Sequence, residues 1–291
     1  MEKILITGAT GPLGKAVTER LIALQGPAAL SVLARDPAKA ADLQAKGVTV
    51  LQADYNDYNS LLQAFTGISK LYFVSGNDIA HRIPQHENVV KAATEAGVGH
   101  IHYTSFQRRT EDGSSPIAFL AAAHLHTEQL IRASGITYTI LKHSLYADFL
   151  PMFLGNQVIT TGQLFFPAGE GKGAFAVRQD MAEAGAAVLA SSGHENKAYE
   201  ICGSHAYSFA EVAEILSELA GKKIVYTAAE PAAYAELLTK AGAPEMAIQA
   251  GVGFGQAIAQ GEFDFPDDTM ERLLGRPAFS LREILKNAYI R

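Results

Sequence analysis

The feature that most constrains the fold is a turn that carries three regularly spaced glycines, Gly8, Gly11 and Gly14. An apolar run at residues 3–7 precedes it, and residues 15–24 follow with apolar side chains at helical spacing. Strand, glycine turn and helix in this order form the start of a βαβ unit that can bind a dinucleotide. Gly8 permits the tight turn, Gly11 lets a pyrophosphate approach the backbone, and Gly14 lets the helix pack close to the strand.

Short strands and helices keep alternating through the first half of the chain. The expected strands cover residues 31–34, 48–53, 70–74, 100–104 and 137–141, and the expected helices cover 37–46, 58–65, 85–96 and 121–134. Strands separated by helices of about ten residues indicate a parallel sheet that is covered on both faces and joined by right-handed crossovers. The predicted fold class is therefore α/β, with a doubly wound parallel sheet of the Rossmann type.

After residue 149 the pattern loosens and then resumes in part. Residues 181–190 are strongly helical, residues 197–202 predict one more strand, and Ser208 is the expected N-cap of a further helix. The remainder is mainly helical, with a short strand at 223–227. We expect a sheet domain and a smaller substrate or lid domain. The first takes residues 1–149 with a return segment at 174–203, and the second takes 150–173 and 204–291.

Charge and cysteine content exclude several kinds of partner. The 291 residues carry 30 acidic and 24 basic side chains, a net charge of −6, so we expect no nucleic-acid partner. Cys202 is the single cysteine, which rules out an intramolecular disulfide and favours a reducing cytoplasm. No stretch of about 18 apolar residues is present, and the glycine turn begins at Gly8, so neither a membrane span nor a signal peptide is expected.

The residue that ends the second strand selects the nucleotide. An acidic side chain there binds a ribose 2′-hydroxyl, whereas an arginine binds a 2′-phosphate through charged hydrogen bonds. This strand ends at Arg35, and Asp36-Pro37 is typical of an N-cap followed by a proline that opens a helix. Lys39 adds a positive charge one turn later. The sequence therefore favours NADP(H) over NAD(H), with a solvated surface charge as the alternative role of Arg35.

Two further segments lie where parallel strands end. Asp54 and Tyr55 close the third strand, where a carboxylate and a ring can meet an adenine, although Asp54 equally well caps the next turn. Val74, Ser75 and Gly76 follow the fourth strand, at the edge where open α/β sheets bind ligands. All five residues are candidate cofactor contacts.

The sequence lacks a catalytic pair at the position where related folds carry it. Carbonyl reductases with this glycine spacing usually have Tyr-x-x-x-Lys on a helix, where the lysine lowers the pKa of the tyrosine. The match at Tyr138 and Lys142 lies in a β-rich run, where the two residues would be about 13 Å apart instead of about 6 Å on a helix. The helix at 121–134 has His124 and Glu128 at these spacings instead. His124 is the one candidate proton donor, and a structural histidine is the alternative.

This absence favours an acceptor whose reduced form needs little acid catalysis. A quinone or a conjugated cation gives a delocalised product, so positioning dominates its reduction. His100 and His102 share a strand face without a nearby carboxylate, so no metal site is expected. Ser105 lacks the G-x-S-x-G context of a nucleophile. An aromatic slot for a flat ligand, or else a domain-interface core, is expected from Phe106, Tyr146, Phe149 and Phe153.

Several segments also carry a family pattern. They are ITGATGPLG at 6–14, ARDPAKA at 34–40, KLYFVSG at 70–76, PQHENVVKAATEAGVGHIHYTS at 84–105, YTILKHSLYADF at 138–149 and GKGAFAVRQDMAEAGAAVL at 171–189. Together they resemble the NmrA-like branch of the atypical short-chain dehydrogenases, in particular its group of NADPH-dependent quinone oxidoreductase 2 and triphenylmethane reductase.

The resemblance implies a Rossmann domain, a small C-terminal domain, a cleft between them, and hydride transfer from NADPH to quinones or cationic dyes. It places cofactor contacts at Gly8, Thr10, Gly11, Pro12, Leu13, Gly14, Arg35, Lys39, Tyr55, Ser75, Gly76, Tyr103, Thr104 and Ser105. Two departures border the expected substrate slot. Lys142-His143 replaces the Arg-Asn of these relatives, and Phe106 follows Ser105. His143 thus joins Phe106, Tyr146 and Phe149 as a candidate substrate contact.

The sequence predicts an NADPH-dependent reductase of a quinone or a similar planar conjugated acceptor, with a small aromatic substrate and no metal. A homodimer is left open. One alternative is a non-catalytic NADP(H) sensor that binds a protein partner, because NmrA-like proteins include such regulators. Another is a sugar-nucleotide epimerase, against which the missing Tyr-Lys pair argues.

Overall fold

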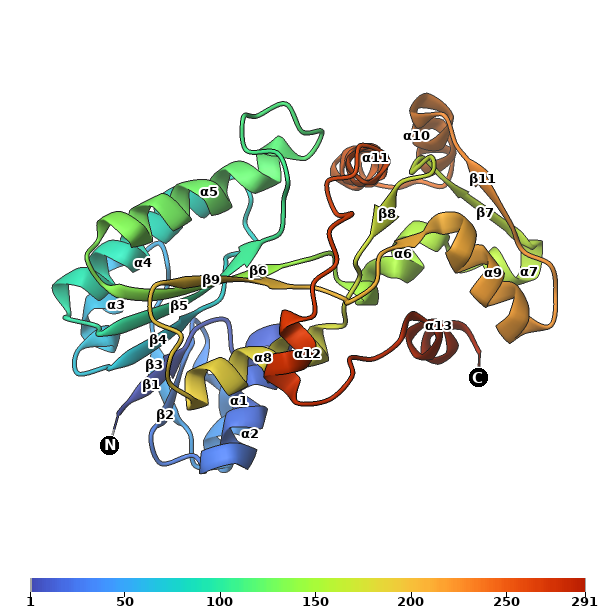
Figure 1. Cartoon of the computed structure of the whole chain (residues 1–291). Coiled ribbons are helices and arrows are strands. Elements are labelled where there is room, and N and C mark those ends of the chain that lie inside the picture. Colours follow the sequence, from blue (N-terminus) through green and yellow to red (C-terminus); the bar gives the residue numbers. More distant parts are fainter. Residues whose placement is uncertain (1, 291) are drawn as a thin grey trace.

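The computed structural model describes residues 2–290, and a parallel sheet forms its centre (Figure 1). Seven strands pair in the order β3-β2-β1-β4-β5-β6-β9. They are β1 (Ile4–Ile6), β2 (Leu30–Ala34), β3 (Thr49–Gln52), β4 (Lys70–Phe73), β5 (His100–Phe106), β6 (Thr137–His143) and β9 (Lys197–Ile201). The strand order turns back at β1, which places a switch point between β1 and β4. The predicted doubly wound sheet is confirmed.

Helices cover both faces of this sheet, as Figure 1 shows. One face carries α1 (Pro12–Gln25), α8 (Arg178–Ala190) and α12 (Thr269–Leu274). The other carries α3 (Tyr58–Phe65), α4 (Arg82–Glu95) and α5 (Ala118–Ala133). Side chains alternate along each strand, so Ile4 and Ile6 enter the core under α1 while Leu5 enters the opposite core. This burial on both faces explains the continuous apolar runs of the strands.

Local signals in the sequence have the expected structural effect at several points. The Asp36 side chain accepts the backbone N–H of Ala38 at 3.1 Å, which confirms that this carboxylate is a cap. The predicted helix at 37–46 is a 3₁₀ turn, η1 (Pro37–Ala40), followed by α2 (Ala41–Ala45). Tyr138 and Lys142 both lie on β6, so the Tyr-x-x-x-Lys match is on a strand, as predicted.

The smaller part of the molecule lies beyond one edge of the sheet (Figure 1). It contains η2 (Ala147–Phe149), α6 (Leu150–Leu154), α7 (Val158–Thr161), β7 (Gln163–Phe166), β8 (Lys172–Gly173), β10 (Tyr207–Ser208), α9 (Phe209–Ala220), β11 (Val225–Ala228), α10 (Pro231–Lys240), α11 (Glu245–Ala259) and α13 (Leu281–Tyr289). A separate apolar core forms around Phe166, Phe209 and Phe263. The Ser208 cap is confirmed: its hydroxyl accepts the Glu211 N–H, and the Glu211 carboxylate accepts the Ser208 N–H.

The chain returns to the sheet layer near its end. Met270 of α12 is buried in the core that α1 and α8 share. The expected division into residues 1–149 with 174–203, and 150–173 with 204–291, stays a prediction, and residues 1 and 291 lie outside the described part.

Substitution of Gly14 by alanine tests the close packing of α1 on β1. A Cβ atom at Gly14 would lie 2.5 Å from the Gly8 carbonyl oxygen, whereas one at Gly11 would lie 3.3 Å from it. We expect Gly14→Ala to lower the free energy of unfolding by about 1–3 kcal/mol and Gly11→Ala by less than about 1 kcal/mol, because only the first forces backbone apart. Denaturant titration of both variants measures this, and equal losses would contradict the packing argument.

Candidate active site

A cavity of about 620 Å³ opens at the carboxyl ends of β1, β4 and β5 and reaches the smaller part of the molecule. This volume is in the usual range for small-molecule sites. Most residues that the sequence singled out line it: Gly8, Thr10, Gly11, Pro12, Leu13, Gly14, Arg35, Asp54, Tyr55, Val74, Ser75, Gly76, Ser105, Phe106, His124, His143, Tyr146 and Phe149. Lys39, Tyr103, Thr104 and Phe153 are not in the wall. The wall also holds Arg82 and Arg178, which are not among the site residues predicted from the sequence.

The glycine turn forms one end of the cavity and leaves a helix terminus open. Gly8 has φ +62°, and the Gly11 N–H donates to the Gly8 carbonyl at 2.9 Å. No side chain caps the N-terminus of α1, and its first turn carries no acidic residue. Free N–H groups and the positive end of a helix dipole attract anions. This end of the cavity therefore suits a phosphate group.

Arg35 lies at the rim of the same end. Its side chain is exposed, and no carboxylate of residues 2–290 lies within 4.0 Å of it. The Asp36 carboxylate accepts the Ala38 N–H as a helix cap, so it does not compete with Arg35 for a ligand at the end of β2. Lys39 is exposed on η1, outside the cavity wall. A free guanidinium without an adjacent acid favours a second phosphate here.

Tyr55 ties the loop after β3 to the end of β4. Its hydroxyl donates to the Val74 carbonyl at 2.9 Å and contacts the Thr7 hydroxyl, which accepts the Val74 N–H at 2.9 Å. Burial raises the pKa of Tyr55 above its usual value, so the hydroxyl stays protonated. The tyrosine therefore fixes the shape of the cavity wall in addition to lining it.

His86 fixes the backbone of the cavity wall at Gly76, and it is not among the site residues predicted from the sequence. Its Nε2 accepts the Gly76 N–H at 2.9 Å, and its Nδ1 lies 2.8 Å from the Thr127 hydroxyl, which donates to the Ala123 carbonyl. Thr127 thus accepts from Nδ1–H, and the ring is neutral with a defined tautomer. Burial, with the nearby Arg82 charge, lowers the pKa of His86 to about 3. Ser75 is held in turn by its N–H, which donates to the Thr104 hydroxyl at 3.0 Å.

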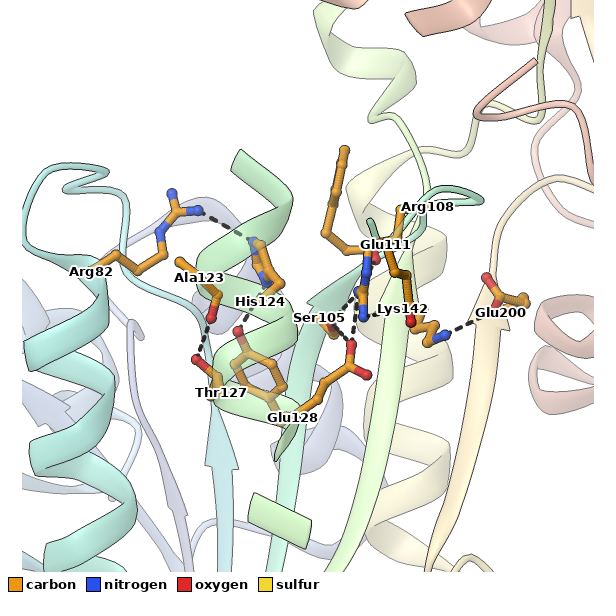
Figure 2. A network of polar contacts seen from close by, with 12 residues as sticks. Arg82, Ser105, Arg108, Glu111, Ala123, His124, Thr127, Glu128, Lys142 and Glu200 are labelled. Atoms are coloured by element: carbon orange, nitrogen blue, oxygen red, sulfur yellow. Dashed lines mark hydrogen bonds and ion pairs between the residues drawn. The ribbon is translucent and has the colours of Figure 1, made fainter. Parts of the chain in front are cut away.

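His124 lies in the cavity wall between two partners (Figure 2). An Arg82 Nη1 group donates to its Nε2 at 3.3 Å, and its Nδ1 lies 2.9 Å from the Tyr103 hydroxyl. Burial and the Arg82 charge hold the pKa of His124 well below its usual value. The proton of this neutral ring is on Nδ1, because Nε2 is the acceptor for Arg82. His124 therefore presents no acidic proton to the cavity.

A buried ion pair lies behind Ser105 in Figure 2. Arg108 donates to Glu128 at 2.9 Å, and their side chains are 1% and 6% exposed. The Ser105 hydroxyl donates to the same carboxylate. Arg108 compensates the charge of Glu128, which stands where a catalytic lysine is usual. The Ser105 oxygen also accepts from Arg108 at 3.5 Å, so the ion pair fixes the orientation of this hydroxyl in the cavity wall.

The far end of the cavity is aromatic. Tyr146 and Phe149 lie 5.6 Å apart between ring centroids, and the Arg178 guanidinium lies over both rings. Phe106 faces them from β5, together with Phe254 of α11. His143 is buried here with both ring nitrogens unbonded, and burial lowers its pKa to about 3.

Phe153 lies elsewhere, in the core of the smaller part. Its ring is 5.1 Å from Phe166, between centroids, so it takes the alternative role of packing.

His100 and His102 line a separate hollow at the amino ends of the strands, and their rings stack at 3.9 Å between centroids. Within residues 2–290, no group of three His, Cys, Asp or Glu side chains is placed to hold a metal ion. No helix of the same residues is long and apolar enough to cross a membrane.

Substitution of Tyr138 tests whether the Tyr-x-x-x-Lys match takes part in chemistry. Its hydroxyl accepts from Arg132 at 2.5 Å, and the residue is absent from the cavity wall. We expect Tyr138→Phe to change reductase turnover by less than about twofold, as for most substitutions away from a site. Steady-state rates of the folded variant measure this. A collapse of kcat would give Tyr138 a catalytic role.

Comparisons with known proteins agree with this geometry. The model of the NmrA-like family matches residues 1–261. The chain is 37% identical to quinone oxidoreductase 2 of Escherichia coli strain K12 over 290 residues, 98% of each protein. A structure of Citrobacter sp. triphenylmethane reductase complexed with NADP(H) has a TM-score of 0.91 at 38% identity, covering 98% of this chain and 99% of that one. The E. coli NADPH-dependent quinone oxidoreductase complexed with NADPH has a TM-score of 0.91 at 35% identity, again over 98% and 99%. The protein belongs to the NmrA-like family.

Proposed function

We propose that this protein is an NADPH-dependent oxidoreductase that transfers a hydride to a quinone or a similar planar conjugated acceptor, triphenylmethane-type dyes included. One observation carries the proposal. A single cavity joins an open helix terminus and a free arginine at one end to an aromatic slot at the other. The relatives named above are a quinone oxidoreductase and a dye reductase, and two of their structures contain NADP(H) or NADPH. These relatives support a catalyst over a non-catalytic sensor.

The residues present fit the cofactor. Gly8, Gly11 and Gly14, with the backbone of residues 10–13, hold the pyrophosphate at the start of α1. Arg35 would hold the 2′-phosphate, with Lys39 as a second positive charge that lies on η1 outside the cavity wall. Asp54 and Tyr55 border the adenine. Val74, Ser75 and Gly76 follow along the wall, and Tyr103, Thr104 and Ser105 support the nicotinamide end.

The bound cofactor supplies a hydride from the nicotinamide ring. The protein contributes mainly positioning, since the hydrogen bonds of Tyr55, His86 and Glu128 fix the wall before any ligand enters. Phe106, Tyr146 and Phe149 give a flat acceptor a surface to stack on and displace water from it. His143 packs at this end of the cavity as a neutral ring whose two nitrogens are buried.

We also propose that the protein works in the cytoplasm and that residues 150–173 and 204–291 act as the substrate side of the cleft. Cys202 is buried, and burial raises the pKa of its thiol to about 11, so it takes no part in disulfide chemistry. We propose no nucleic-acid partner, in keeping with the net charge of −6.

The loss of NADPH absorbance with and without a small benzoquinone tests the function. We expect quinone-dependent oxidation of NADPH that exceeds the oxidation of NADH under the same conditions. NADPH binding without oxidation by any quinone or cationic dye would favour the sensor instead. Epimerisation of a nucleotide sugar would replace the proposal altogether.

Substitution of Arg35 tests the cofactor preference. We expect Arg35→Ala to weaken NADPH binding by about 10- to 100-fold, the worth of a charged hydrogen bond, and to leave NADH binding nearly unchanged. Arg20→Ala removes an exposed arginine of α1 outside the cavity wall and serves as the control. Fluorescence titration with both nucleotides gives the ratio of dissociation constants. A ratio that Arg35→Ala leaves unchanged would refute the assignment.

A further inference from the structure

Arg82 is a buried cation in the cavity wall, and no carboxylate among residues 2–290 forms an ion pair with it. The residue is 7% exposed, and its one hydrogen bond goes to His124 Nε2 at 3.3 Å (Figure 2). Its Nε atom is buried without a partner. Within residues 2–290, no carboxylate lies within 4.0 Å of its guanidinium, and the charge of Asp78 acts on it only from farther away. An unpaired buried charge is costly, and a ligand is the usual reason to keep one.

The other arginines near the slot are compensated. Arg108 pairs with Glu128 at 2.9 Å, and Arg178 pairs with Asp148 at 3.2 Å. The histidines beside Arg82 bring no negative charge, because burial keeps both His124 and His143 neutral. Arg82 is therefore a buried arginine without a carboxylate partner among residues 2–290, and it lines the same cavity as Phe106 and Tyr146.

We propose that Arg82 binds the negative oxygen of the reduced acceptor and so selects neutral quinones over cationic dyes. This inference rests on the proposed function and deepens it. A hydride brings an electron pair and a proton from NADPH to the quinone, which is reduced by two electrons while NADPH is oxidised to NADP⁺. The neutral quinone becomes a hydroquinone monoanion, and its oxygen accepts hydrogen bonds from Arg82 until water protonates it. A cationic dye becomes neutral on reduction, and Arg82 repels its bound ground state.

The charge at position 82 is tested with a matched pair of variants. Arg82→Met keeps the unbranched stem of the side chain and removes its charge, whereas Arg82→Lys keeps the charge. With saturating NADPH, we expect Arg82→Met to lower kcat/KM for benzoquinone by about 10²-fold, the effect of losing one oxyanion donor. We expect its kcat/KM for the cationic dye crystal violet to be unchanged or raised, and Arg82→Lys to keep the wild-type order of acceptors. Equal losses on both acceptors with Arg82→Met, or no loss on either, would overturn the proposal.

A binding measurement separates this proposal from the proposed function. The probe is 2-hydroxy-1,4-naphthoquinone in its anionic form, titrated into the NADP⁺ complex beside neutral 1,4-naphthoquinone. The wild type should favour the anion, Arg82→Lys should retain that preference, and Arg82→Met should lose it by about tenfold or more, as expected for a charged hydrogen bond. If the wild type oxidises no NADPH with any acceptor, the proposed function fails, and this titration alone decides the role of Arg82. An unchanged preference in Arg82→Met refutes the anion site even if quinones are reduced.

Discussion

The close approach of α1 to β1 is the constraint on which the rest of the site depends. Gly14 has no room for a Cβ atom against the Gly8 carbonyl, and this contact brings the uncapped start of α1 to the carboxyl edge of the sheet. The strand order reverses at the same place, between β1 and β4, which opens a space above the strand ends. A favourable site for a phosphate therefore exists before any side chain contributes charge.

Charge compensation distinguishes the structural side chains from those that meet a ligand. Glu128 is paired with Arg108 behind the wall, and His86 is neutral and satisfied at both nitrogens. These groups fix the backbone at Gly76 and the hydroxyl of Ser105. Arg35 and Arg82 line the same cavity, and neither pairs with a carboxylate among residues 2–290. Such a division suits a catalyst that relies on positioning and fixed charge in place of an acidic side chain.

The sequence predicts the sheet layer well because helices such as α1, α4 and α5, of 14 to 16 residues, separate its short apolar strands and its turns carry specific residues. Asp36 and Ser208 cap their helices as their sequence contexts indicate. Residues 150–173 show no period because their helices and strands have five residues or fewer, too short for a pattern to repeat. Arg82 lies outside the family segments, and His86 lies in the segment at 84–105 without a chemical signal of its own. Their roles depend on α5, which lies beside α4 in space but far along the chain.

The central claim is that cofactor and acceptor occupy one cavity at the same time and that no covalent carrier takes part. Initial rates with NADPH and benzoquinone varied together test it most directly. We expect intersecting double-reciprocal lines, because a ternary complex must form before hydride transfer. Parallel lines, the mark of a ping-pong reaction in which the first product leaves before the acceptor binds, would contradict it.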